Sequence, residues 1–68
     1  MGGGMKVCII KSGDVYFRKF VLNTPEMDSD IRGARRLSKS RAKIIKRHLK
    51  KTGYKSEIIE LRHYNERT

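Results

Sequence analysis

The sequence predicts an α+β fold in the order strand, strand, helix, strand, and three observations support it. Two runs rich in Val, Ile and aromatic residues are separated by a glycine-containing turn, which is typical of a β-hairpin. A basic segment follows with apolar residues at helical spacing, and a last apolar run closes the pattern. We therefore expect a ββαβ domain, with a three-stranded antiparallel sheet of order 2-1-3 and one basic amphipathic helix packed on one face.

The hairpin is predicted from residues 7–10 and 15–22, which are joined by Ser-Gly-Asp at positions 12–14. Residues 23–30 contain Asn, Thr and Pro, so they are predicted to form a loop that ends in candidate helix caps. Residues 56–64 are predicted to form the third strand.

Two interpretations of the basic segment remain open. The first is a single helix over residues 29–52, which tolerates Gly33 at a cost of about 1 kcal/mol. The second is a short turn over residues 30–36, followed by a helix over 39–52 that Ser38 caps. A single helix would be longer than the strands that it covers, so we favour the second. Both place the same five basic side chains on one exposed ridge, namely Lys39, Lys43, Lys46, Arg47 and Lys50.

The helix is predicted to cover one sheet face through Ala42, Ile45 and Leu49, with Arg41 as the one basic residue among the apolar positions. The other sheet face is also predicted to be apolar, because residues of both parities are apolar in all three strands. A single helix cannot cover both faces. We therefore expect the open sheet face to be buried by a partner, with a homodimer as one possibility.

The chain length bounds the organisation. With 68 residues we expect a single domain over 5–64, residues 1–4 as an added leader outside the fold, and 65–68 as a tail that frays. The single cysteine excludes an internal disulfide, which favours a reducing, cytoplasmic setting. No apolar stretch is long enough to span a membrane, so no membrane partner is expected.

The positive charge is concentrated in one segment. The net charge is +10, yet residues 31–56 alone contain eleven Lys and Arg and no acid. Neighbours three and four apart on the predicted ridge repel each other, which weakens the helix slightly. A polyanion would compensate for this, so we expect nucleic acid or an acidic protein as partner. The expected nucleic-acid-binding residues are Arg36, Lys39, Lys43, Lys46, Arg47, Lys50 and Lys51.

Other chemistry is not indicated by the sequence. Cys8 lies in an apolar strand and is interpreted as a small buried hydrophobe. His48 and His63 lack the spacing of metal ligands, so no metal and no cofactor are expected. No nucleophile and base are set in a recognisable pattern, which predicts a protein that is not an enzyme. Phe17 and Phe20 alternate with basic residues as in single-strand binders, but core packing is the preferred interpretation.

The pattern from "VCIIKSGDVYF" through "ARRL" to a capped helix and a final "EIIEL" resembles small accessory proteins of phages and mobile elements. The resemblance covers most of residues 6–61. It implies a ββαβ fold, a host-interaction or anti-defence role and the host cytoplasm as location, and it assigns no functional residue. The helices of such proteins usually mix Glu with Lys, and this chain departs from them in its uniformly basic ridge.

Two functional hypotheses follow. The first is a non-enzymatic nucleic-acid-binding protein that contacts the phosphate backbone, of DNA or RNA, through the basic helix ridge. The second is a small phage-type inhibitor or adaptor that docks on an acidic host protein surface, with Tyr16 or Phe20 of the open sheet face as apolar anchors.

Overall fold

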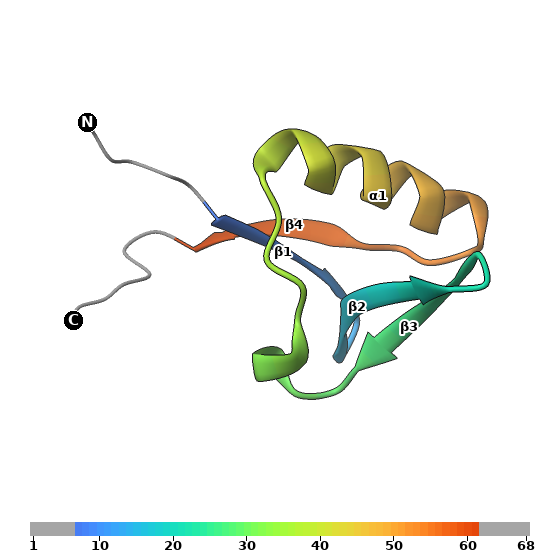
Figure 1. Cartoon of the computed structure of the whole chain (residues 1–68), viewed down its shortest axis with the longest axis horizontal. Coiled ribbons are helices and arrows are strands. Elements are labelled where there is room, and N and C mark those ends of the chain that lie inside the picture. The colour runs from blue at the N-terminus through green and yellow to red at the C-terminus, as the bar shows by residue number, and fades with distance from the viewer. Residues whose placement is uncertain (1–6, 62–68) are drawn as a thin grey trace.

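The computed structural model describes residues 7–61, which form one antiparallel sheet with a helix on one face (Figure 1). The strand order is β3-β2-β1-β4, and every neighbouring pair is antiparallel. The expected α+β class is confirmed. The elements in chain order are β1 (Val7–Ser12), β2 (Val15–Val21), β3 (Thr24–Asp28), the 3₁₀ helix η1 (Ile31–Gly33), α1 (Lys39–Lys51) and β4 (Glu57–Leu61).

Some of the predictions fall on residues outside the described range 7–61. These are the leader over residues 1–4, the tail over 65–68, the last residues of the predicted third strand, and His63.

The prediction of three strands is wrong, because residues that were expected to form a loop form strand β3. The chain reverses at Leu22 and Asn23, whose φ angles of 51° and 66° are positive at both central positions, as a tight hairpin turn of type I′ requires. Pro25 is compatible with this strand because β3 lies at the edge of the sheet, where a missing N–H can face outward. The predicted order of the other three strands is preserved, with β3 added beside β2.

Strand β2 contains an irregularity that changes which side chains share a face. Its pairing with β3 shifts register between Phe17 and Lys19, as a β-bulge does. Phe17 and Phe20 have opposite parity, yet their ring centroids are only 5.0 Å apart. Part of the sequence argument for two apolar sheet faces therefore fails, because both rings lie on the same side of β2.

Strands β1 and β2 pair only near their shared turn, at Lys11 with Tyr16 and Ser12 with Val15. Farther along, the segment between η1 and α1 bonds to both strands. The N–H of Arg35 donates to the carbonyl of Phe17 at 2.9 Å, and Leu37 exchanges two backbone hydrogen bonds with Cys8, at 2.7 and 2.8 Å. This segment thus satisfies strand groups that would otherwise lack partners.

Helix α1 follows the favoured interpretation of the sequence, a short turn and then a capped helix. Ser38 is its N-cap, and its hydroxyl accepts a hydrogen bond from the N–H of Arg41. At the other end Gly53 has a φ of +96°. The N–H of Gly53 donates to Lys50 and that of Tyr54 donates to Leu49, which is the pattern of a Schellman motif.

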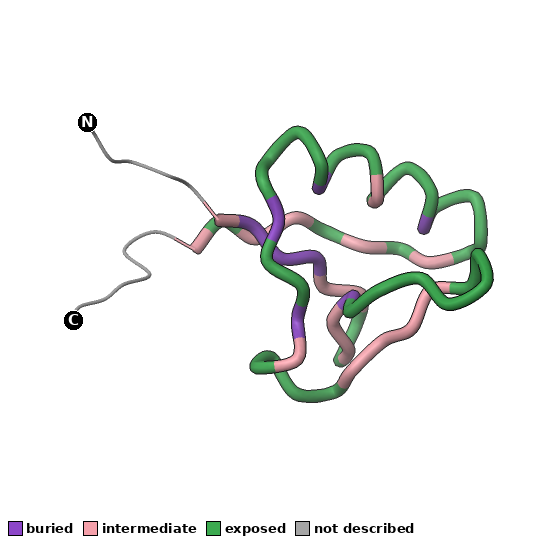
Figure 2. Tube along the Cα trace, in the orientation of Figure 1, coloured by how far each residue is buried: buried purple, intermediate pink, exposed green. Residues whose placement is uncertain are grey.

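The core lies between α1 and the sheet (Figure 2). The predicted contacts of Ala42, Ile45 and Leu49 with the sheet are confirmed, and Cys8 is buried as expected. On the opposite sheet face Ile9 is only 1% exposed, so this residue is already buried without a partner. The buried cluster comprises Cys8, Ile10, Phe17, Leu37, Ala42 and Leu49, with Met27, Ile45, Tyr54 and Ile58 packed against it.

Candidate nucleic-acid interface

The basic residues of α1 divide between its two flanks. At about 100° per residue, Lys39, Lys43, Lys46 and Lys50 fall within an arc of about 60°. Arg41 and His48 lie on the other side of the buried arc. Arg47 and Lys51 lie between the two, on the outer face. The lysines of the expected ridge form a row beside β4, and Arg41, which lies outside that ridge, belongs to a separate basic group beside β2.

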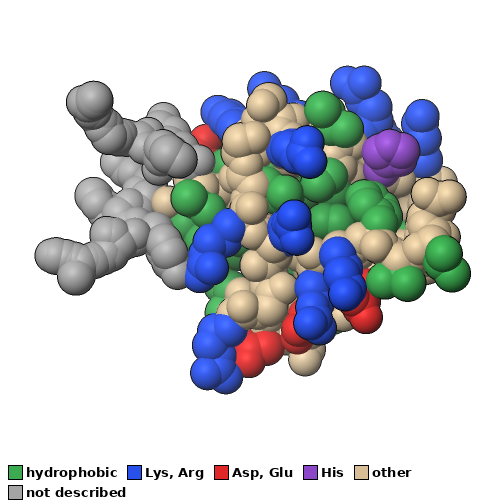
Figure 3. All heavy atoms as spheres, in the orientation of Figure 1, with side chains coloured by type: hydrophobic (Ala, Val, Ile, Leu, Met, Phe, Trp, Pro, Cys, Tyr) green, Lys and Arg blue, Asp and Glu red, His purple; other side chains and the backbone are tan. Residues whose placement is uncertain are grey.

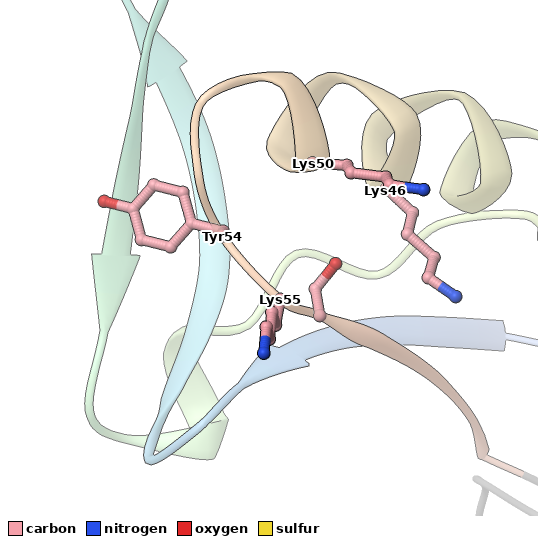
Figure 4. Close-up of a pocket in the computed structure, with 5 residues that line it drawn as sticks. Lys46, Lys50, Tyr54 and Lys55 are labelled. Carbon is pink, nitrogen blue, oxygen red and sulfur yellow. The ribbon is translucent and has the colours of Figure 1, made fainter.

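We call the first flank the lysine groove. It consists of two adjoining hollows between α1 and the residues that lead into β4, with volumes of about 250 and 360 Å³, and Lys46 and Lys50 line both. Figure 4 shows Lys46 and Lys50 extending from the same stretch of α1, while the ring of Tyr54 points away from their amines. The remaining lining residues are Lys43, Arg47, Lys55, Ser56 and Ile58.

Most cations of the lysine groove have no acidic partner. Lys39, at the start of the row, lies 3.1 Å from a carboxylate oxygen of Glu60. Within residues 7–61, Lys43, Lys46 and Lys50 have no carboxylate within 4.0 Å. Their charges are therefore available to an external anion.

Ser56 is among the residues that line the lysine groove. Its hydroxyl oxygen is buried and has no hydrogen-bond partner among residues 7–61. A buried hydroxyl without a partner is unfavourable by about 1–3 kcal/mol.

We call the second flank the arginine pocket. It is a hollow of about 190 Å³ between α1, β2 and the segment before α1. Figure 3 shows this side of the molecule, where hydrophobic side chains lie between groups of Lys and Arg side chains. No acid is among the lining residues, which are the cations Arg18, Lys19, Arg35 and Arg41 and the apolar residues Phe17, Phe20, Leu37 and Ile45.

Phe20 is the aromatic residue of the arginine pocket that solvent reaches. Phe17 is buried as predicted, but the prediction that Phe20 packs in the core is wrong, because 39% of its surface is exposed. One side of its ring is supported by Phe17, and His48 approaches edge-on at 5.9 Å between centroids. The bulge in β2 is the physical reason, since it turns Phe20 towards the rim of the core.

The N-terminal turn of α1 is positive throughout. It contains Lys39 and Arg41 and no acid, although the partial positive charge of a helix N-terminus favours acids at this position. By contrast, the acid before η1 is locally paired. Hydrogen bonds from the Arg32 side chain, and then from the Arg32 N–H, lower the pKa of Asp30.

The structure brings together some of the predicted binding residues and separates others. Lys43, Lys46, Arg47 and Lys50 line the lysine groove, while Lys51 is exposed on α1 and lines neither the groove nor the arginine pocket. Arg36 is exposed in the segment before α1 and makes an interaction of its own. The sequence alone does not assign a binding role to Arg18, Lys19, Arg35, Lys55 and Ser56. For Arg41, its position inside the apolar arc was the one signal in the sequence.

Comparisons of the chain with protein-family models, curated proteins and solved structures gave no match. Within residues 7–61, no cluster of three His, Cys, Asp or Glu is placed to hold a metal ion. No helix in this range is both long and apolar enough to cross a bilayer.

Proposed function

We propose that this protein binds nucleic acid without catalysis and holds the phosphate backbone in the lysine groove. The observation that supports the proposal most is the row of Lys43, Lys46 and Lys50, which has no acidic partner in the described chain. Seven residues of helix separate its ends, or about 10 Å along the axis. That length corresponds to about three phosphates of one DNA strand at 3.4 Å of axial rise each.

Repulsion between the lysines of this row destabilises helix α1 in the free protein. Like charges three and four positions apart destabilise a helix by a few tenths of a kcal/mol per pair. The basic first turn of α1 adds an unfavourable interaction with the helix dipole. Phosphates bound along the helix would reduce both penalties. The binding proposed here is independent of base sequence, because lysine contacts to phosphates read no base edges.

The test is a double variant, Lys46→Gln with Lys50→Gln, compared with the control Lys11→Gln with Arg32→Gln. Both variants lose two charges, but Lys11 lies on β1 and Arg32 in η1, outside the lysine groove. Fluorescence anisotropy would measure the affinity for a 20-base-pair duplex between 50 and 200 mM salt.

If Lys43, Lys46, Lys50 and Lys55 contact phosphates, the logarithm of the parent's binding constant should fall against the logarithm of the salt concentration with a slope of about −3.6. The parent then loses about 150-fold in affinity over this salt range. The lysine variant should lose only about 12-fold, and the control should match the parent. Equal behaviour of all three proteins would contradict the proposal.

A second candidate function is docking on an acidic protein, as an inhibitor or adaptor. The observation that favours it is Leu22, which is 92% exposed at the tip of the β2–β3 hairpin. It holds a positive φ that is strained for its side chain. An exposed apolar residue at the tip of a hairpin is suited to a protein interface. This function predicts little affinity for any nucleic acid at 150 mM salt.

A further inference from the structure

We propose that the arginine pocket is a stacking site for an unpaired base, with Phe20 as the platform, and that the protein therefore prefers single-stranded nucleic acid. This inference rests on the proposed function, because it names the form of nucleic acid that the same helix binds best. It concerns the flank of α1 opposite the lysine groove, so the two can be tested separately.

The Phe20 ring is held in place in the free protein. Phe17 supports it at 5.0 Å between centroids, and His48 contacts it edge-on at 5.9 Å. The backbone of β2 is fixed on both sides here, because Phe20 pairs with Pro25 of β3 and the carbonyl of Phe17 accepts a hydrogen bond from Arg35. A preorganised ring loses little conformational entropy when a base stacks on it.

The rim of the arginine pocket is suited to the phosphates on either side of that base. Arg35 and Arg41 have no carboxylate within 4.0 Å among residues 7–61. Arg18 has only a distant one, at 3.8 Å from Asp28, and more than half of its side chain is exposed. One guanidinium group can donate two parallel hydrogen bonds to the oxygens of a phosphate, and it can also stack on the plane of a base. Exposed aromatics in a cationic groove are the means by which proteins hold single strands.

A duplex cannot use this site. Its bases are stacked on each other and present only their edges in the grooves, so the face of the Phe20 ring has no base to contact. The lysine groove, in contrast, can hold phosphates of either form. The two flanks therefore differ in what they select, and removing the aromatic ring should affect single strands alone.

The first experiment uses Phe20→Trp. The parent contains no tryptophan, so the variant has a single indole reporter in the arginine pocket. Titration with dT20 or rU20 should quench its fluorescence in parallel with binding measured by anisotropy, while a 20-base-pair duplex should quench it far less. Unchanged indole fluorescence at saturating dT20 and rU20 would overturn the inference.

The second experiment compares Phe20→Leu with the control Ile44→Ala. Ile44 is also exposed and apolar, but it lies on the outer face of α1 and lines neither the lysine groove nor the arginine pocket. Loss of the ring should weaken binding of dT20 roughly tenfold and leave the duplex affinity unchanged, whereas Ile44→Ala should change neither. Circular dichroism melts would establish that both variants fold, and if Phe20→Leu does not, the tryptophan reporter decides.

The outcomes separate this inference from the proposed function. If the parent binds duplex and single strands through Lys46 and Lys50 and Phe20→Leu binds both equally well, only the stacking site is wrong. If the parent binds no nucleic acid but loses a protein partner on Phe20→Leu, both proposals are wrong and the arginine pocket is a protein-docking site.

Discussion

The two flanks of α1 have similar positive charge but differ in the side chains that lie beside it. The lysine groove presents ammonium groups in a row along the helix, and its aromatic residue, Tyr54, packs against the core. The arginine pocket presents guanidinium groups around Phe20, a ring that solvent reaches. The two flanks therefore differ in whether an exposed aromatic ring lies beside the charge, and the proposals above assign a different form of nucleic acid to each for that reason.

The largest effect is expected from Arg35→Gln with Arg41→Gln, which removes the rim of the arginine pocket. If these two cations add to four from the lysine groove, the parent's affinity for dT20 falls about 300-fold between 50 and 200 mM salt, and the variant's about 50-fold. Duplex affinity should not change, in contrast to the lysine double variant, which weakens binding of both forms. Anisotropy titrations of both variants against both nucleic acids would measure this. If the arginine variant loses as much affinity for the duplex as for dT20, the two flanks act as one binding site and the distinction between them is wrong.

A smaller effect is expected from Gly53→Ala, which strains the turn between α1 and the end of the lysine groove. An alanine at a φ of +96° is unfavourable by about 1–2 kcal/mol. For a domain of this size the melting temperature should fall by roughly 5–10 °C. Gly53→Asn is the matched control, and it should lose less because Asn adopts positive φ more readily. Equal melting temperatures for parent and alanine variant would contradict the Schellman geometry.

The smallest effect is expected from Leu22→Asn at the β2–β3 turn. Asn accepts the positive φ of 51° better than Leu does, so the variant should be more stable by about 0.5–1 kcal/mol. The turn is separate from both flanks, so affinity for dT20 and duplex should remain that of the parent. Thermal melts and anisotropy would check both statements. Loss of a protein complex in this variant, with nucleic acid binding absent throughout, would favour the adaptor function.

The sequence predicts the helix well because its signals are local. Ser38 as the cap, Gly53 as the stop and the apolar arc of Ala42, Ile45 and Leu49 act within one or two turns. Strand β3 is not predictable in the same way. Pro25 argues against a strand in general, and only the position of β3 at the sheet edge makes it acceptable.

Of the two parts of the candidate site, the sequence predicts the lysine row but not the arginine pocket. Helical spacing alone places Lys43, Lys46 and Lys50 together on one side of the helix. The arginine pocket requires the bulge in β2 and the hydrogen bond from Arg35 to Phe17, which join segments distant in the chain. Alternation along β2 places Phe17 and Phe20 on opposite faces, and the bulge reverses that.

The central claim, that nucleic acid lies along both flanks of α1, is tested most directly by amide chemical shifts in a ¹⁵N-labelled chain titrated with dT20 at low salt. We expect shifts concentrated at Phe20, Arg35 and Arg41 and along residues 43–56, with Ile9, Lys11 and Asp14 unchanged. A duplex of the same length should change the amide chemical shifts of residues 43–56 and leave the amide shift of Phe20 unchanged. Shifts centred on β1 with α1 unaffected, or no shifts at all, would contradict the account.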